Sequence, residues 1–147
     1  MSRHRGPAEI LLVEDNPGDV RLAIEAFGEG SAGGKVRVAR DGEEALAVLR
    51  RQDPHSKAPR PDLIVLDLNL PKKDGRELLG EIKQDASLRR IPVVILTTSN
   101  AEQDILNTYD LHANCYIIKP VALDRFISAI KAIESFWLTL VALPPPE

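Results

Sequence analysis

The stretch Leu63-Ile64-Val65-Leu66-Asp67 is an uninterrupted apolar run that ends in a carboxylate. A second run of this kind, Ile10-Leu11-Leu12-Val13, ends in Glu14-Asp15. Each run has the length and composition of a strand that is buried on both faces of a parallel sheet. Ligands of such sheets bind outside the carboxyl ends of the strands. If the two strands are neighbours, three carboxylates converge on one pocket, where like charges would hold protons or bind a hard cation such as Mg²⁺.

Strand-like and helix-like patterns alternate along the rest of the chain. Runs rich in Val, Ile and Leu predict strands over residues 9–14, 35–39, 63–66, 91–96 and 114–118. Turn chemistry and helical periodicity predict helices that begin near Pro17, Asp41 and Gly75, and two more over 101–111 and 122–139. Because strand–helix–strand crossovers are right-handed, this order predicts an α/β fold: a flavodoxin-like, doubly wound, five-stranded parallel sheet in a three-layer α-β-α sandwich.

The spacing of apolar residues predicts which sides of the first and last helices face the core. In the first helix, Val20, Ile24 and Phe27 recur at helical spacing, and Asp19 is expected to face water. In the last helix, the stripe expected to pack against the sheet consists of Leu123, Phe126, Ile127, Ile130 and Ile133. Both helices are therefore predicted to be amphipathic.

The bulk composition fits one globular domain. The 147 residues are 44% hydrophobic and 28% charged, which excludes a disordered chain and a membrane protein. The net charge of −3 gives no electrostatic footprint for nucleic acid. No signal-peptide core is present and no apolar run reaches about 18 residues, so a cytoplasmic protein is expected. We expect a flexible N-terminus over 1–8, one domain over 9–140 and an apolar, proline-rich tail over 141–147.

Two further strand ends supply polar groups, Thr97 and Lys119. Carboxylates, a hydroxyl and an ammonium group at one edge of a sheet suit the transfer of a phosphoryl group to an aspartate, with Asp67 as the nucleophile. Mg²⁺ held by Asp15 and Asp67 would offset the repulsion between these carboxylates and the incoming phosphate. Lys119 would supply a positive charge opposite the metal, and Thr97 a hydrogen bond to a phosphoryl oxygen.

Four segments carry a resemblance to a known family. They are Ile10-Leu-Leu-Val-Glu-Asp15-Asn, Pro61-Asp-Leu-Ile-Val-Leu-Asp67-Leu-Asn-Leu-Pro71-Lys-Lys-Asp-Gly75, Pro92-Val-Val-Ile-Leu-Thr97 and Tyr116-Ile-Ile-Lys119-Pro120. On these segments, the chain resembles the receiver domain of two-component response regulators from residue 9 to about residue 137. The resemblance implies that a phosphohistidine on a sensor histidine kinase is the phosphoryl donor.

The resemblance also implies roles for individual residues. Asp67 would be the phosphoacceptor and Asp15 a direct Mg²⁺ ligand, while Glu14 would act through water and the backbone carbonyl of Asn69 would complete the protein ligands. After phosphorylation, Thr97 would move toward the phosphoryl group and the ring of Tyr116 would swing inward, as a two-state switch. Asn69 and Ser99 would influence how long the phosphate persists.

One position departs from the family's pattern. His112 stands at a helix end where such domains usually carry glycine, because that position favours a left-handed backbone. Histidine tolerates this conformation better than most residues do. We therefore expect mild local strain and no loss of activity.

The finer pattern resembles the small regulators that pair with bacterial phytochrome kinases. The relevant stretches are Val13-Glu-Asp-Asn-Pro-Gly-Asp-Val-Arg-Leu22, Ile95-Leu-Thr-Thr-Ser99 and Ala132-Ile-Glu-Ser-Phe-Trp-Leu138. The resemblance implies a phytochrome-type kinase as partner, although no residue encodes a response to light. The sequence stops after the receiver, so we expect output through protein contacts or onward phosphotransfer.

Apolar residues continue beyond the expected end of the last helix. One face of a domain rarely buries this many apolar side chains, which include Phe136, Trp137, Leu140 and Val141. Such a surplus marks an interface, so a symmetric homodimer is predicted, with contributions from the fourth helix and fifth strand. The alternative is that the tail folds back over its own domain.

Three other functions fit the residues less well. A phosphatase with an aspartate nucleophile would need a second carboxylate at position 69, which is Asn, and an inserted cap domain. A flavodoxin-like flavin protein would need a phosphate loop where Glu14-Asp15 repel phosphate. The remaining alternative is a receiver-like binding module that works without phosphorylation. We expect a regulator rather than a turnover enzyme, although such domains take part in their own phosphorylation and dephosphorylation.

Overall fold

A computed structural model describes residues 7–28 and 34–145 and contains one parallel sheet in the order β2-β1-β3-β4-β5. The strands are β1 (Glu9–Val13), β2 (Lys35–Ala39), β3 (Leu63–Leu66), β4 (Val93–Thr97) and β5 (Cys115–Ile118). Neighbouring strands pair in parallel throughout. The five predicted strands and the doubly wound, flavodoxin-like fold are therefore confirmed.

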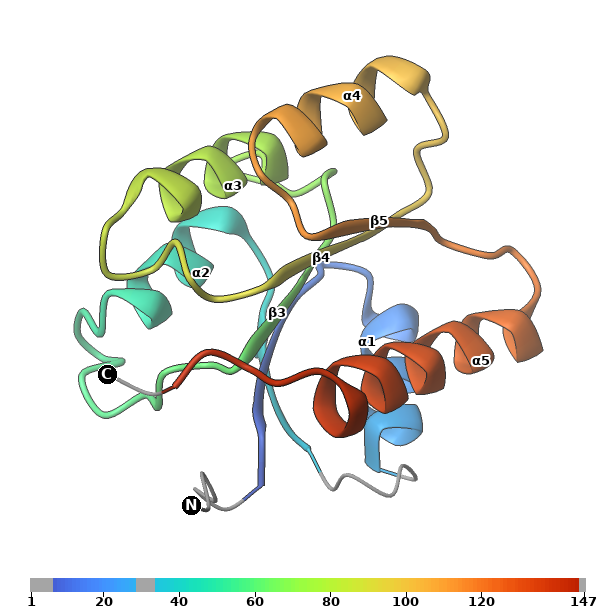
Figure 1. Cartoon of the computed structure of the whole chain (residues 1–147), viewed down its shortest axis with the longest axis horizontal. Coiled ribbons are helices and arrows are strands. Elements are labelled where there is room, and N and C mark those ends of the chain that lie inside the picture. The colour runs from blue at the N-terminus through green and yellow to red at the C-terminus, as the bar shows by residue number, and fades with distance from the viewer. Residues whose placement is uncertain (1–6, 29–33, 146–147) are drawn as a thin grey trace.

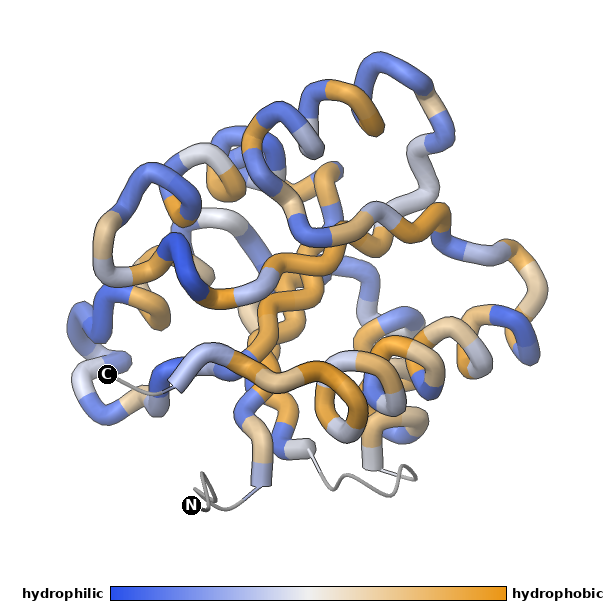
Figure 2. Tube along the Cα trace, in the orientation of Figure 1, coloured by the Kyte–Doolittle hydropathy of each residue, from blue (hydrophilic) through white to orange (hydrophobic). Residues whose placement is uncertain are grey.

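Helices cover both faces of the sheet. They are α1 (Pro17–Gly28), α2 (Gly42–Leu49), α3 (Gly75–Gln84), α4 (Glu102–Asp110) and α5 (Leu123–Glu134). Figure 1 shows α1 and α5 on one face of the sheet and α2, α3 and α4 on the other. Figure 2 shows that the strands between these layers are the most hydrophobic part of the chain.

Each face of the sheet has its own buried cluster because successive strand residues point to opposite faces. Within β1, Leu11 and Val13 belong to the cluster that also contains residues of α2 and α3. Ile10 and Leu12 belong to the cluster that also contains residues of α1 and α5. Burying each such side chain contributes about 1.5–3 kcal/mol, so the central strands are fixed from both sides.

Short connections and a close glycine contact fix the carboxyl end of the sheet. The side chain of Asp41 caps α2 by accepting a hydrogen bond from the backbone of Glu44 at 2.7 Å, as predicted. A Cβ at Gly75 would lie 2.3 Å from the backbone oxygen of Asp67. Only glycine therefore allows α3 to begin directly against the residue that follows β3.

Two predicted core residues are exposed instead. Ile24 of α1 is 43% exposed, because this helix packs on the sheet through Val20, Phe27 and the small residues Ala23 and Ala26. Leu123, the first residue of α5, is 57% exposed, since the helix meets the core only from its second turn onward.

The C-terminal segment returns over its own domain. The last α-helix ends at Glu134 rather than at 139, and the chain continues as a π-helical stretch, η1 (Ser135–Leu140). Trp137 and Leu138 pack against the α1/α5 side of the core, whereas Phe136 and Leu140 remain exposed. The π-helical stretch thus places some of its apolar side chains against the core and leaves others at the surface.

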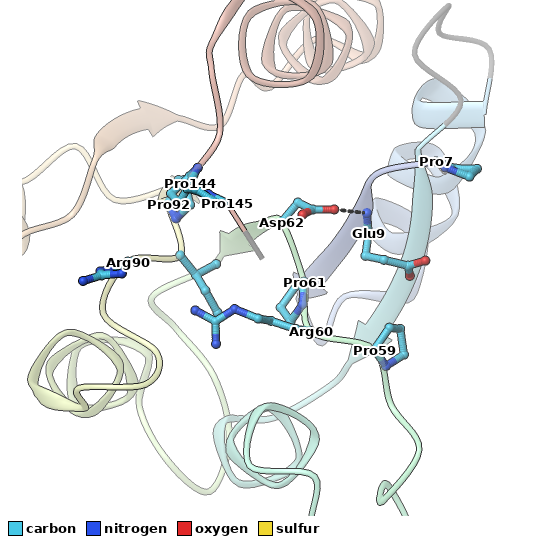
Figure 3. Close-up of a pocket in the computed structure, with 11 residues that line it drawn as sticks. Pro7, Glu9, Pro59, Arg60, Pro61, Asp62, Arg90, Pro92, Pro144 and Pro145 are labelled. Carbon is cyan, nitrogen blue, oxygen red and sulfur yellow. Dashed lines mark hydrogen bonds between the residues drawn. The ribbon is translucent and has the colours of Figure 1, made fainter. Parts of the chain in front are cut away.

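Beyond η1, the tail lies at the amino end of the strands. Pro144 and Pro145 line a hollow of about 210 Å³ together with Pro7, Arg60 and Pro92, among others. Figure 3 shows the two tail prolines beside Pro92, across the hollow from Pro7. The tail up to residue 145 therefore adopts the predicted alternative of folding back, which by itself does not decide the oligomeric state.

The left-handed backbone predicted at residue 112 is confirmed, because His112 has φ 71°. Residues 1–6, 29–33 and 146–147 lie outside the described part of the chain, so the flexible N-terminus remains a prediction. Among the described helices, none has the length and apolarity needed to cross a membrane.

Candidate functional site

Three carboxylates meet at the carboxyl end of the two central strands. β1 and β3 pair so that Val13 lies opposite Leu66, which places the following residues, Glu14 and Asp67, side by side. One oxygen from each of Glu14, Asp15 and Asp67 lies within 4.8 Å of the others. Glu14 and Asp67 are buried, and Asp15 is exposed. The predicted convergence of these residues is confirmed.

Lys119 reaches this acidic cluster from the end of β5. Its Nζ lies 2.7 Å from Glu14 Oε1, 2.8 Å from Asp19 Oδ2 and 3.5 Å from Asp67 Oδ2. The backbone N–H of Lys119 donates to the carbonyl of Thr97 at 2.6 Å, which ties the ends of β4 and β5 together. The ammonium group is therefore buried among carboxylates.

Burial and charge shift the pKa values of this cluster. Burial raises the pKa of Glu14, aided by the negative charge of Asp67 and opposed by the hydrogen bond from Lys119. Burial acts to lower the pKa of Lys119, but its hydrogen bonds to Asp19 and Glu14 outweigh this effect and raise it above the ordinary value. Lys119 therefore stays charged at neutral pH and partly offsets the repulsion among the carboxylates.

Thr97 completes the set of strand-end residues. Its side chain is fully buried, and Oγ1 has no hydrogen-bond partner in the part of the chain that the structure describes. A buried hydroxyl without a partner costs about 1–3 kcal/mol, so a function at this strand end is one explanation for keeping it. The predicted grouping of Asp15, Asp67, Thr97 and Lys119 at one edge of the sheet is thus observed.

A family model described as the response regulator receiver domain matches residues 10–131. The chain belongs to the response regulator receiver family.

Relatives within this family share most of the chain. The response regulator Rcp1 of Synechocystis sp. is 50% identical over 138 residues, which are 94% of each protein. The solved structure of the phosphorylated cyanobacterial phytochrome response regulator RcpA is 52% identical, with a TM-score of 0.92 over 95% of this chain and 99% of that one. The bacteriophytochrome response regulator AtBRR is 42% identical, with a TM-score of 0.73 over 93% and 99%. The chain is therefore a two-component regulator related to phytochrome response regulators, rather than a metabolic enzyme.

The acidic cluster of this receiver fits a divalent cation. Its donors are carboxylate oxygens, which hard cations prefer, and one ammonium group cannot neutralise all of them. The backbone N–H of Asn69 donates to Asp67 Oδ1 at 3.3 Å, so residue 69 lies beside the cluster. The structure of Rcp1, 50% identical with a TM-score of 0.91 over 94% of this chain and 99% of that one, was solved with Mn²⁺ bound.

The two predicted switch and tuning residues outside the cluster contact each other. The hydroxyl of Tyr116 donates to the backbone carbonyl of Ser99 at 2.9 Å, and the ring packs against the core. The hydroxyl of Ser99 donates to Asp104 of α4 at 2.6 Å, and Asp104 in turn binds Arg76 of α3 at 2.9 Å. The loop after β4 is thus held by both its backbone and a side chain.

The sequence prediction missed one member of the site, Asp19. It was expected to face water, but its carboxylate accepts a hydrogen bond from Lys119. A signal was available, because Asp19 lies in the first turn of a helix that starts two residues after Asp15. A side chain so close to the strand end remains near the carboxyl edge of the sheet, whichever side of the helix it occupies.

Proposed function

We propose that Asp67 accepts a phosphoryl group from a phosphohistidine of a phytochrome-type sensor kinase, in a Mg²⁺-dependent reaction, and that the product switches protein contacts in the cytoplasm. The observation that carries this proposal is the position of Asp67 among an ammonium group, an unpartnered buried hydroxyl and two further carboxylates. Burying charged groups and an unpartnered hydroxyl costs free energy, so their concentration at one strand edge supports a functional site there.

The transfer forms one bond and breaks one. A carboxylate oxygen of Asp67 attacks phosphorus, a P–O bond forms, the P–N bond breaks, and the imidazole nitrogen keeps the electron pair and takes a proton. When held by Asp15, Asp67 and the backbone carbonyl of Asn69, with Glu14 acting through water, Mg²⁺ would supply positive charge that offsets phosphate–carboxylate repulsion. Lys119 and the hydroxyl of Thr97 then donate hydrogen bonds to phosphoryl oxygens.

The same contacts can couple phosphorylation to the surface. Thr97 has a hydroxyl free to turn toward a phosphoryl oxygen, and its movement would shift the loop that carries Ser99. Tyr116 is bonded to that loop, so its ring would follow. Ser99 is hydrogen-bonded to Asp104, so any effect of Ser99 on phosphate lifetime would depend on the position of α4. Asn69 would affect the phosphate lifetime from its place beside Asp67.

The test is incubation with Mg²⁺ and acetyl phosphate, followed by intact mass measurement. We expect one added phosphoryl group, which Asp67→Asn and omission of Mg²⁺ each abolish. Asp110→Asn, which removes an exposed carboxylate at the far end of α4, is the matched control and should not change the uptake. Uptake that persists in Asp67→Asn would reject Asp67 as the acceptor. Absence of uptake by the wild type, from acetyl phosphate and from a phytochrome kinase alike, would favour the phosphorylation-independent binding module.

We also propose a homodimer on the side of the edge strand β5. An apolar hollow of about 520 Å³ lies there, lined by Cys115, Ile117, Phe136 and Trp137, among others. Phe136 is 50% exposed beside it and Leu140 is 74% exposed beyond it. A second copy that inserts Phe136 into this hollow would bury the surface, with Val141 at the margin and α4 and β5 extending the contact.

Sedimentation velocity on point variants tests the dimer more cleanly than truncation, because truncation would also remove Trp137 from the core. Phe136→Ser should shift the protein toward monomer. Ile24→Ser, which changes an exposed apolar residue of α1, should leave the sedimentation coefficient unchanged. A Phe136→Ser protein that sediments as the wild type does would reject this interface.

A further inference from the structure

We propose that Asp19 is a positioning residue that competes with the phosphoryl group for Lys119, and so limits how tightly the site holds a phosphoryl group. This inference rests on the proposed function of Asp67 as phosphoacceptor. It concerns a residue that the roles assigned above leave unused.

The geometry of Lys119 is the starting point of the proposal. An ammonium group has three hydrogens to donate. Two of them are committed to Glu14 and Asp19, at 2.7 and 2.8 Å, whereas the oxygen of Asp67 lies at 3.5 Å, beyond ordinary hydrogen-bond length. In the structure, Lys119 is therefore hydrogen-bonded to Glu14 at the end of β1 and to Asp19 in α1, and not to Asp67 Oδ2.

The two committed bonds differ in how easily they can be exchanged. The side chain of Glu14 is 5% exposed, and that of Asp19 is 26% exposed. Water reaches the Asp19 carboxylate, so it screens this ion pair and can replace Lys119 as a partner at low cost. Glu14 is shielded from bulk water, so its bond to Lys119 is screened less and is harder to exchange. When Lys119 turns to a phosphoryl oxygen, the bond to Asp19 is the one that is given up.

Asp19 does not duplicate the role of the metal ligands. The acidic cluster contains Glu14, Asp15 and Asp67, whose oxygens lie within 4.8 Å of one another, and Asp19 is not part of it. Its negative charge therefore acts on Lys119 without contributing to the cation site. Since a phosphoryl group adds about 1.5–2 negative charges, Asp19 also opposes it directly.

The backbone holds Asp19 in place for this role. It lies in the first turn of α1, and its N–H donates to the side chain of Asn16 at 3.0 Å. The carboxylate is thus presented from a fixed helix end rather than from a loose loop. An acidic residue in the first turn of a helix also interacts favourably with the helix dipole. The test must therefore distinguish this stabilising role from competition for Lys119.

The experiment measures the affinity for BeF₃⁻, a phosphoryl analogue, at saturating Mg²⁺ by isothermal titration calorimetry. Asp19→Asn keeps the shape but weakens the acceptor, so we expect BeF₃⁻ to bind about two- to fivefold more tightly and the aspartyl phosphate to last longer by a similar factor. Glu25→Gln removes the same charge from the exposed side of α1 and should match the wild type. Asp19→Glu restores the charge and should return the affinity toward that of the wild type.

The outcomes separate this inference from the proposed function. If the wild type binds BeF₃⁻ only when Asp67 is intact, the site works as proposed. If Asp19→Asn then binds BeF₃⁻ equally or more weakly, Asp19 is an anchor or a helix-end residue, and the competition is rejected. An Asp19→Glu protein that binds as tightly as Asp19→Asn would reject it too. If the wild type fails to bind BeF₃⁻ at all, the proposed function fails first.

Discussion

Lys119 and Lys83 lie at opposite ends of the sheet, and both are partly shielded from water, but their partners differ. Lys119 donates to the carboxylates of Glu14 and Asp19. Lys83, near the end of α3, donates to the backbone carbonyls of Arg89 and Ile91, at 3.0 and 2.9 Å, and to the side-chain oxygen of Asn114 at 3.2 Å.

The different partners give the two lysines opposite acid–base behaviour. Neutral oxygens do not offset the burial of Lys83, which lowers its pKa to about 8. The carboxylates around Lys119 do offset burial, and its pKa rises. At the amino end of the sheet, Lys83 thus connects α3 to the backbone before β4 and to the side chain of Asn114 before β5. The carboxyl end keeps a charged lysine among carboxylates, which is the arrangement that the proposed phosphoryl transfer requires.

The largest expected effect comes from removing the lysine at the carboxyl end. Lys119→Met removes the ammonium group from the acidic cluster and the charged hydrogen-bond donor from the phosphoryl group, so the rate of phosphorylation by acetyl phosphate should fall about 10²–10³-fold. Lys57→Met, at an exposed loop position, should change nothing. A fall of less than tenfold would mean that Lys119 is only a structural counter-ion.

The buried hydroxyl of Thr97 is predicted to serve the site without stabilising the fold. Thr97→Val keeps the shape and removes an unpartnered hydroxyl, so the free energy of unfolding should stay the same or rise by about 1 kcal/mol, while phosphorylation no longer changes partner binding. Thr108→Val is the matched control. Thr108 is equally buried, but its hydroxyl donates to backbone carbonyls of α4, so this variant should lose about 0.5–1.5 kcal/mol. Urea denaturation distinguishes the two, and equal losses would contradict the prediction.

The smallest effect is a pH dependence at the amino end. Between about pH 8 and pH 10.5, the unfolded chain keeps the proton of Lys83 that the folded protein has released, so this group makes stability rise with pH in that window. Lys83→Met should remove this rise, measured as the difference between the two urea-denaturation curves against pH. Burial raises the pKa values of Cys115 and Tyr116, so these two groups make the free energy of unfolding fall as the pH rises. Both proteins contain them, so their contribution cancels in the difference between the two curves. A pH-independent difference would show that Lys83 stays charged throughout.

Sequence alone predicted most of the site because strand order determines it. The apolar runs before Asp67 and Glu14 marked buried parallel strands, and the carboxyl ends of such strands meet at one edge. The same rule predicted that Thr97 and Lys119, which lie at the ends of two other strands, are at this edge. Helical periodicity, in contrast, predicts which side of a helix a residue lies on. It does not predict how close that residue lies to the end of the preceding strand. It therefore placed Asp19 in water although the first turn of α1 borders the site.

The other differences arise from packing that a hydrophobic pattern does not describe. The pattern favoured Ile24 over Ala23, but small residues let a helix approach a sheet closely, and Ala23 is the buried one. The end of α5 was predicted as regular helix. The docking of Trp137 and Leu138 against the core accompanies its widening into a π-helix, and no local preference in the sequence signals this.

The hollow at the amino end has a practical consequence. Pro7 and Pro145 both border it, so the first and last described residues of the chain lie near each other, at the pole opposite the acidic cluster. Fluorescent reporters fused at either point would emerge at the end of the sheet opposite Asp67. Joining the two points through a short linker should yield circular permutants whose phosphorylation by acetyl phosphate matches that of the wild type.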